Sequence, residues 1–281
     1  MKRAECRSVP VFVAILVLGL AIGMPQAHAG EYDLSVVGTI PGHGADTALV
    51  WKDGTFWALD SQPTGEWATQ FATDGTPLAS FSVPVSANAA GLAWGQSAWW
   101  VANNTGDQIL ECDESFNIVN TYSASLSQLT GLVWGGGNLW ACDNASDTIY
   151  QVTLSGGSAS FTPWSSGNPD PVGLAWDGSS IWSISHPGGS GNADPDRRDI
   201  YRHGTGGAVL DTYHYPERYG QGITFMDGQL CYLEISGLEY ASDAEIVLTD
   251  IGASDDSPEP ATWLLLACTC GAGAVLRRRS E

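Results

Sequence analysis

Tryptophan pairs with the spacing W-x5-W recur along the middle of this 281-residue chain. The four pairs are Trp51/Trp57, Trp94/Trp100, Trp134/Trp140 and Trp176/Trp182. Phe225 and Cys231 hold the same positions in a fifth, decayed copy. The steps between the first aromatics are 43, 40, 42 and 49 residues. A period of this size is typical of solenoids, propellers or arrays.

Each copy is interpreted as four short strands joined by tight turns. In Gly91-Leu92-Ala93-Trp94, Leu92 and Trp94 face one side of a strand and Ala93 the other. Asp-Gly turns such as Asp53-Gly54 then indicate a hairpin to the strand of the second aromatic. A third strand recurs at 108–110, 148–150 and 199–201, and a fourth at 78–81, 118–122 and 209–213. Four antiparallel strands per repeat predict a propeller blade.

The sequence therefore predicts an all-β fold, a five-bladed β-propeller over residues 30–251. A helical solenoid is excluded by 34 glycines and by the lack of a 3.6-residue apolar stripe. The fifth copy supplies only three strands, so we expect residues 32–40 to add its outer strand and close the ring. A six-bladed alternative would need about one further repeat of ~40 residues, which the chain does not contain.

The N-terminus has the pattern of a secretory signal peptide. Lys2, Arg3 and Arg7 precede an apolar run over 11–22, and Ala27-His28-Ala29 is a small-x-small site. We expect cleavage after Ala29. A transmembrane anchor is the alternative, but the run is short and ends in a cleavage-like site.

The C-terminus combines a Pro-Glu-Pro segment, an apolar stretch over 263–276 and a basic cluster. Fourteen residues rise about 21 Å as a helix, a little short of the roughly 30 Å hydrocarbon layer. The arginines favour the cytoplasmic side, so a transmembrane helix here leaves residues 30–257 outside the inner membrane. The segments that define this pattern are Pro258, Glu259, Pro260, Arg277, Arg278 and Arg279.

This order of features resembles the bacterial PEP-CTERM sorting signal, over residues 258–281 and after a linker at 252–257. The resemblance implies that an exosortase, a membrane transpeptidase, recognises Pro258-Glu259-Pro260 and releases or transfers the exported chain. The protein would be held transiently in the inner membrane and then reach the cell surface or the medium. An ordinary tail anchor, with the same topology, is the alternative.

The charge of the repeat region excludes nucleic acid as a partner. The two ends hold 6 of the 11 Lys and Arg but only 3 of the 31 Asp and Glu. The exported part therefore keeps 5 basic against 28 acidic residues, a net charge of −23. Binding to phosphates needs clustered basic residues, whereas this composition favours solubility and attraction for cations.

Polar side chains are predicted to gather on one rim, where first strands begin and second strands end. Carboxylate and amide oxygens near one axis suit a hard cation such as Ca²⁺. Asx turns at strand ends are the simpler explanation for any one residue. The candidate ligand or metal positions are Asp46, Asp60, Asn103, Asp143, Asp170, His186 and Glu234.

No catalytic motif accompanies this rim. The sequence has neither the histidine spacing of a zinc protease nor a G-x-S-x-G elbow. The periodic tryptophans are interpreted as core, whereas Trp67 and Trp164 are candidates for exposed stacking surfaces. Cys112, Cys142 and Cys231 remain in the repeat region, and their odd number indicates buried thiols rather than a disulfide framework.

The repeats, with Gly-Leu-x-Trp, a turn, Leu-Trp and Ile-Tyr, resemble the NHL-like and glutaminyl-cyclotransferase-like propellers across residues 31–250. These motifs are structural and carry no activity over. The leading hypothesis is a non-enzymatic, exosortase-sorted propeller that binds extracellular polysaccharide or protein. The alternative is a metal-dependent propeller enzyme, a lactonase or lyase acting on a small extracellular substrate.

Overall fold

The computed structural model describes residues 30–41, 46–62, 65–85, 88–166, 169–185, 198–215, 219–235 and 244–251. All regular elements within these ranges are β-strands. No described segment is a helix long and apolar enough to cross a membrane. The signal-peptide, linker and sorting-signal predictions, with Ala29, Pro258-Glu259-Pro260 and Arg277–Arg279, lie outside the described residues.

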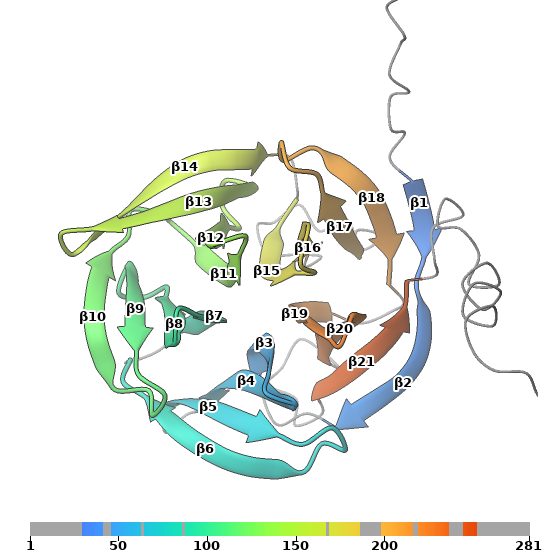
Figure 1. Ribbon diagram of the computed structural model, residues 1–281, viewed down its shortest axis with the longest axis horizontal. Coiled ribbons are helices and arrows are strands. Elements are labelled where there is room, and N and C mark those ends of the chain that lie inside the picture. Colours follow the sequence, from blue (N-terminus) through green and yellow to red (C-terminus); the bar gives the residue numbers. More distant parts are fainter. Residues whose placement is uncertain are drawn as a thin grey trace, which may run out of the picture.

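The strands form antiparallel meanders arranged around a central axis (Figure 1). The innermost strand of each meander carries the first aromatic of the repeat. These strands are β3 (Asp46–Lys52), β7 (Ala89–Gly95), β11 (Leu129–Gly135), β15 (Pro171–Trp176) and β19 (Tyr219–Met226). The second strands are β4 (Thr55–Gln62), β8 (Ala98–Asn103), β12 (Asn138–Asp143), β16 (Ile181–Ser185) and β20 (Gln229–Ile235).

The third strands are β5 (Gly65–Phe71), β9 (Gln108–Cys112), β13 (Thr148–Ser155), β17 (Asp199–His203) and β21 (Ala244–Asp250). The outer strands are β6 (Pro77–Val83), β10 (Ile118–Ser123), β14 (Ser158–Ser166), β18 (Val209–His214) and β2 (Ser35–Pro41). The strand positions predicted from the repeat are therefore confirmed. A single parallel pair, Ser123 with Ser158, joins two meanders into one eight-stranded sheet.

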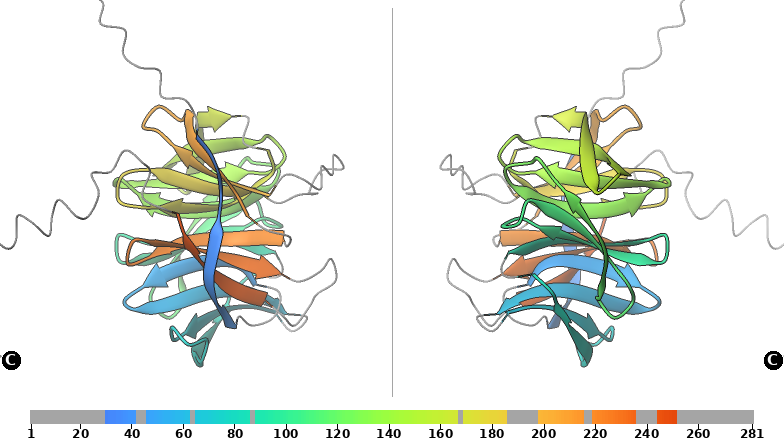
Figure 2. Two further views of the ribbon diagram at one scale, coloured as in Figure 1. Left: turned by 90° about the vertical axis from the view of Figure 1, so that its right-hand side faces the viewer. Right: turned by 90° about the vertical axis from the view of Figure 1, so that its left-hand side faces the viewer.

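The N-terminal strands cross the outside of the ring between two meanders (Figure 2). As predicted, β2 pairs antiparallel with β21, from Ser35 opposite Asp250 to Pro41 opposite Glu245. The strand predicted over 32–40 is divided at Leu34, and its first residues belong to a separate strand, β1 (Gly30–Asp33), which pairs in parallel with β18. The first residues of the described chain thus bind the outer edges of both the β15–β18 and the β19–β21 meanders.

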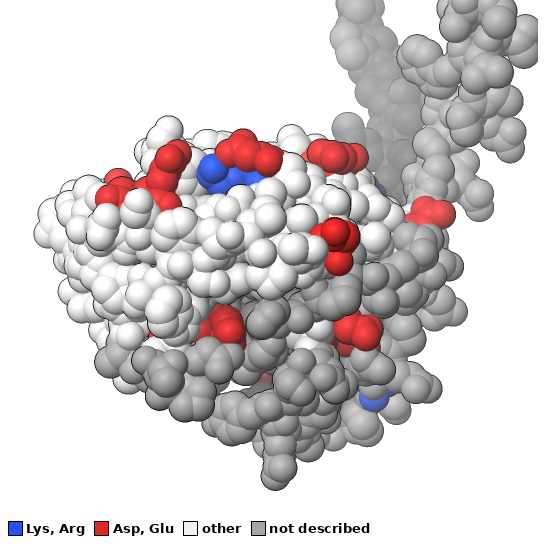
Figure 3. All heavy atoms as spheres, turned by 90° about the horizontal axis from the view of Figure 1, so that it is seen from below, with Lys and Arg blue, Asp and Glu red and all other residues white. Residues whose placement is uncertain are grey.

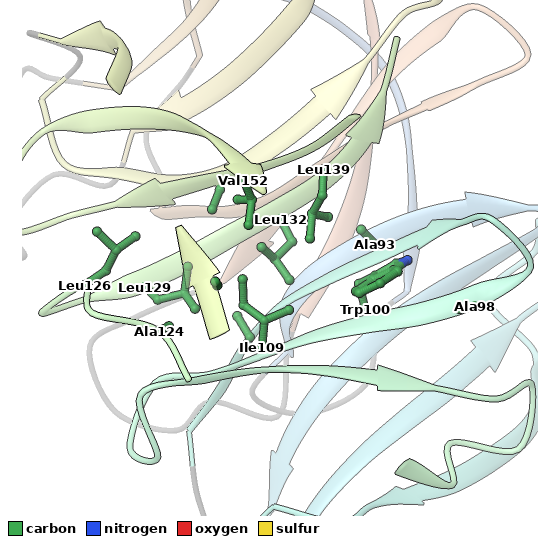
Figure 4. Packing of buried hydrophobic residues seen from close by; sticks show 13 residues of the cluster. Ala93, Ala98, Trp100, Ile109, Ala124, Leu126, Leu129, Leu132, Leu139 and Val152 are labelled. Atoms are coloured by element: carbon green, nitrogen blue, oxygen red, sulfur yellow. The ribbon is translucent and has the colours of Figure 1, made fainter. Parts of the chain in front are cut away.

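The core lies between neighbouring meanders rather than inside any one of them. Figure 4 shows this packing between β7–β10 and β11–β14, where Trp100, Ile109 and Leu132 belong to one buried cluster. Trp100 stacks on Trp134 of the next meander, with ring centroids 5.5 Å apart. The interpretation of the periodic tryptophans as packing residues is therefore confirmed for this interface.

The W-x5-W spacing has a local cause in the hairpin of each first and second strand. The Trp100 indole N–H donates to the Gly95 carbonyl at 3.0 Å, and Trp140 donates to Gly135 at the same distance. The second tryptophan thus bonds to the residue that follows the first. In the first repeat, Lys52 holds the position of Gly95 and Gly135, and its carbonyl accepts from the Thr55 hydroxyl instead. Trp57 Nε1 has no hydrogen-bond partner among the described residues.

Glycines let the innermost strands approach one another closely at the axis. A Cβ placed on Gly91 would lie 2.2 Å from the Thr130 carbonyl oxygen, and one on Gly131 would lie 2.9 Å from the Cα of Gly173. The same relation continues around the ring, with 2.7 Å from Gly173 to Gln221 O and 2.6 Å from Gly222 to Leu49 N. The repeated glycine of Gly-Leu-x-Trp is therefore a packing requirement.

Candidate functional site

The upper rim, where first strands begin and second strands end, carries one polar residue at the same position in each repeat. All five side chains are at most 8% exposed, so the rim position is folded into the domain rather than projecting from it. These residues are Asp60, Asn103, Asp143, Ser185 and Glu234.

Two of these residues bind the loop that follows their own strand. Asn103 Oδ1 accepts from Gly106 N at 3.2 Å, and its amide nitrogen donates to Gln108 Oε1 at 3.3 Å. Asp143 Oδ1 accepts from Ala145 N at 2.8 Å, while its Oδ2 accepts from Ser127 N at 3.2 Å. These are the local turn bonds that Asp and Asn favour.

The remaining candidates lie at the predicted strand ends. Asp60 pairs in register with Asp46, and Glu234 lies opposite Gly220 and Glu245. The Asp170 amide donates to Asp147 Oδ1 at 2.8 Å, which ties the start of β15 to the loop between β12 and β13. His186 lies outside the described residues.

The rim loops meet as the repeat predicts. The Asn104 amide donates to the Asn88 carbonyl at 3.1 Å, and the Asn144 amide donates to the Gln128 carbonyl at the same distance. Among the described side chains, no group of three or more His, Cys, Asp or Glu is arranged to hold a metal ion.

A buried serine–histidine pair lies away from the rim, on β16 and β17. Ser183 Oγ and His203 Nε2 are 2.8 Å apart, and both residues are fully buried. Burial lowers the pKa of His203 to about 4, so the ring is neutral near pH 7. Without solvent access, the pair is a core hydrogen bond rather than a nucleophile with its base.

The three thiols of the repeat region are buried, as predicted. Cys112, Cys142 and Cys231 are free and fully buried. Burial raises the pKa of Cys142 to about 11, which keeps it protonated. Trp164 differs from its prediction as an exposed platform: it is half-buried and packs on Trp140, with ring centroids 4.9 Å apart. Trp67 is also half-buried.

The lower face, formed by the turns between first and second strands, opens into an axial cavity of about 140 Å³. The first aromatic of every repeat lines this cavity. A separate space of only about 10 Å³ lies beside the axial glycines. Lys52 Nζ lies 4.3 Å from the Trp94 ring centroid. In the side view of Figure 3, scattered acidic groups outnumber the basic ones. The lining aromatics are Trp51, Trp94, Trp134, Trp176 and Phe225.

No protein-family model matches the sequence, and none of the curated proteins does. Among solved structures, the chain is similar to a glutaminyl cyclase from Myxococcus xanthus, at 14% identity and a TM-score of 0.62. The match covers 80% of this chain and all of that one.

Weaker similarities link the chain to a streptogramin B lyase and to a nidogen/laminin complex. The lyase match has 14% identity, covers 76% of this chain and 98% of that one, and has a TM-score of 0.45. The complex match has 15% identity, covers 68% and 73%, and has a TM-score of 0.48. The cyclase shares its fold with this chain, at a sequence identity too low to transfer an activity. The described part of this chain is a β-propeller.

Proposed function

We propose that the protein is an exported, exosortase-sorted binding or structural protein of the cell surface or the extracellular polysaccharide matrix. The observation that supports a binding or structural role is the hydrogen bonding of the rim side chains. Asn103 and Asp143 use their side-chain oxygens to accept amides of their own and neighbouring loops, which supports a structural role for these two rim positions.

We also propose that this propeller has five blades. The meanders β3–β6, β7–β10, β11–β14 and β15–β18 follow the chain, and β19–β21 with β2 form the last. The close approaches of the axial glycines run through the innermost strands in that order and return from Gly222 to Leu49. This order supports five blades rather than six.

The destination is proposed from the two ends of the sequence. The N-terminal pattern up to Ala29 supports export, and Pro258-Glu259-Pro260 followed by an apolar stretch and Arg277–Arg279 supports sorting by an exosortase. The test is fractionation of cells that express the wild type or a variant with Pro258, Glu259 and Pro260 changed to alanine. We expect the variant to stay in the inner membrane; equal release of both chains would contradict sorting.

A metal-dependent lactonase or lyase is the second candidate, because the related fold of the Myxococcus protein hosts an enzyme. Metal analysis of the purified protein, followed by turnover assays on sugar lactones and peptides, separates the two functions. The binding role predicts no turnover and retention on matrix polysaccharide or matrix protein. Turnover that the substitutions Asp60→Asn and Asp143→Asn abolish would replace the binding role with the enzymatic one.

A further inference from the structure

A second cavity opens on the lower face, at the interface between the β15–β18 meander and β19–β20. It measures about 300 Å³. Its polar wall comes from Asp177, Ser179 and Arg202, and its aromatic wall from Trp182, Tyr213 and Phe225. Phe225 also lines the axial cavity, so one side chain separates the two spaces. We call this second cavity the side pocket.

The side pocket lies at the interface where both sides of a repeated contact change. In two earlier copies the first tryptophan packs on a glycine: a Cβ on Gly95 would lie 2.0 Å from Trp134 Cγ, and one on Gly135 would lie 2.7 Å from the Trp176 ring. At the third such interface, Asp177 replaces the glycine and the smaller Phe225 replaces the tryptophan. A close-packed contact has thereby become a pocket with a carboxylate in its wall.

Asp177 is held rigidly in this wall. Its Oδ2 accepts the Trp182 indole N–H at 2.7 Å, and its Oδ1 accepts the amides of Ser179 at 2.7 Å and Ser180 at 2.6 Å. Burial raises the pKa of Asp177, but these hydrogen bonds outweigh burial and bring it below the ordinary value. The carboxylate is therefore charged at neutral pH and fixed in one orientation.

Arg202 supplies donors on the opposite side. Its Nε and Nη2 both bind Asp211 Oδ2, at 2.6 and 2.5 Å. Within the described part of the chain, its remaining nitrogen, Nη1, has no recorded partner, and about a third of the side chain is exposed. The guanidinium lies over the Trp182 ring, 6.0 Å from the centroid, which fixes its plane.

The charge of the walls selects among ligands. Asp211 balances Arg202, which leaves the Asp177 carboxylate as a net negative charge on a protein that is itself strongly acidic. An anionic ligand is therefore disfavoured. A neutral ligand with hydroxyl groups can donate to Asp177 and Ser179, accept from Arg202 and place its C–H face on Phe225. The volume lies at the lower end of the ~300–1,000 Å³ typical of ligand pockets.

We propose that the side pocket binds a single neutral sugar residue of an extracellular glycan. This inference rests on the proposed binding function and narrows it to uncharged saccharides held on the lower face, away from the upper rim. It excludes uronic-acid polymers as preferred ligands, because their carboxylates would lie close to Asp177.

The test measures binding of maltohexaose, cellohexaose and mannohexaose, with a hexamer of mannuronate as the acidic comparison. Titration calorimetry and tryptophan fluorescence are applied to the purified full-length protein. Phe225→Trp fills the side pocket with the residue the repeat uses elsewhere, and Ser179→Trp obstructs it from an exposed turn. Trp94→Phe is the matched control, since Trp94 lines the axial cavity only.

We expect the wild type to bind at least one neutral hexamer and the mannuronate at least tenfold more weakly. Phe225→Trp and Ser179→Trp should each raise Kd tenfold or more, and Trp94→Phe should leave it within twofold. Preferred binding of mannuronate, or neutral binding unchanged in both filled variants, overturns the inference while the binding function stands. A wild type that binds matrix protein but no saccharide does the same, whereas one that binds neither overturns both.

Discussion

The Trp182 indole nitrogen donates a hydrogen bond to the Asp177 carboxylate, with 2.7 Å between Nε1 and Oδ2. The equivalent Trp100 and Trp140 donate instead to backbone carbonyls of Gly95 and Gly135. One repeat has thus exchanged a main-chain acceptor for a charged side chain. This exchange keeps the hairpin bonded while opening the interface beside it.

Replacing Asp177 by alanine should destabilise the domain. The change leaves a buried indole N–H without its acceptor and removes the bonds to Ser179 and Ser180, at a cost of about 1–3 kcal/mol. Urea unfolding followed by fluorescence measures this loss. Asp113→Ala is the control, because Asp113 also binds the amides of its own turn but no indole. An equal loss in both variants would mean that only the turn matters.

Stability should fall as the pH drops from 6.5 toward 4. Burial lowers the pKa of His203 to about 4 in the folded chain. Between pH 6.5 and pH 4 the His203 ring is therefore protonated in the unfolded chain but neutral in the folded one, which favours unfolding. The loss is about 2 kcal/mol at pH 5 relative to pH 7.5. Denaturation at several pH values measures it, and His203→Gln should flatten the profile. A variant with the same slope as the wild type would exclude His203 as the cause.

Tyr215→Phe should loosen the junction between β16 and β19. The Tyr215 hydroxyl donates to the Ser185 carbonyl at 2.6 Å and accepts from Gly220 N at 3.2 Å, all in a buried setting. Removing the hydroxyl leaves the Ser185 carbonyl and the Gly220 amide without this hydrogen-bond partner, which should lower the free energy of unfolding by about 1–3 kcal/mol. Hydrogen exchange at Gly220 and the unfolding midpoint report the effect. Tyr122→Phe, whose hydroxyl binds the partly exposed Glu111, should cost less.

Gly91→Ala should cost about 3 kcal/mol, the upper part of the range for overpacking. Its new Cβ would meet the Thr130 carbonyl at 2.2 Å, and backbone cannot rotate away as a side chain can. Gly206→Ala is the control, since nothing lies within 4 Å of its Cβ position. Thermal unfolding of the two variants gives the comparison. A Gly91→Ala midpoint like that of the control would refute the close approach of the axial strands.

The three thiols of the repeat region should resist alkylation in the native state. Burial raises the pKa of Cys112 and Cys231 to about 12, and both the thiolate fraction and access are therefore minimal. A chain with Cys6, Cys268 and Cys270 changed to serine should take up no iodoacetamide until denaturant is added. Rapid native labelling would contradict the buried positions.

Much of the fold can be predicted from the sequence because the same turn residues and aromatic spacings recur in each repeat. The Asp53-Gly54 turn adopts positive φ at both residues, as an Asp-Gly hairpin requires. The spacing of Trp94 and Trp100 places the Trp100 indole N–H beside the Gly95 carbonyl, to which it donates. Trp140 and Gly135 form the same hydrogen bond in the next repeat. Even the pairing of β2 with β21 followed from counting strands in the last copy.

What the sequence could not supply depends on contacts between copies. Gly30–Asp33 lacks the apolar alternation of a strand, and its pairing with β18 does not follow from the repeat. Phe225 marks a decayed copy in the sequence, but the pocket that it forms with Asp177 depends on the contact between two repeats. The rim residues Asn103 and Asp143 were correctly aligned, but their local hydrogen bonds depend on side-chain torsions that a repeat pattern does not fix.

The pairing of β2 with β21 also governs how the chain must be made. Ser35 is synthesised early and its partner Asp250 late, so the edge of β2 that pairs with β21 has no partner during nearly all of synthesis. Pairing over such a separation is slow, and an unpaired edge invites association with other chains. The pairing edge of β2 therefore stays open to other chains until β21 has been made.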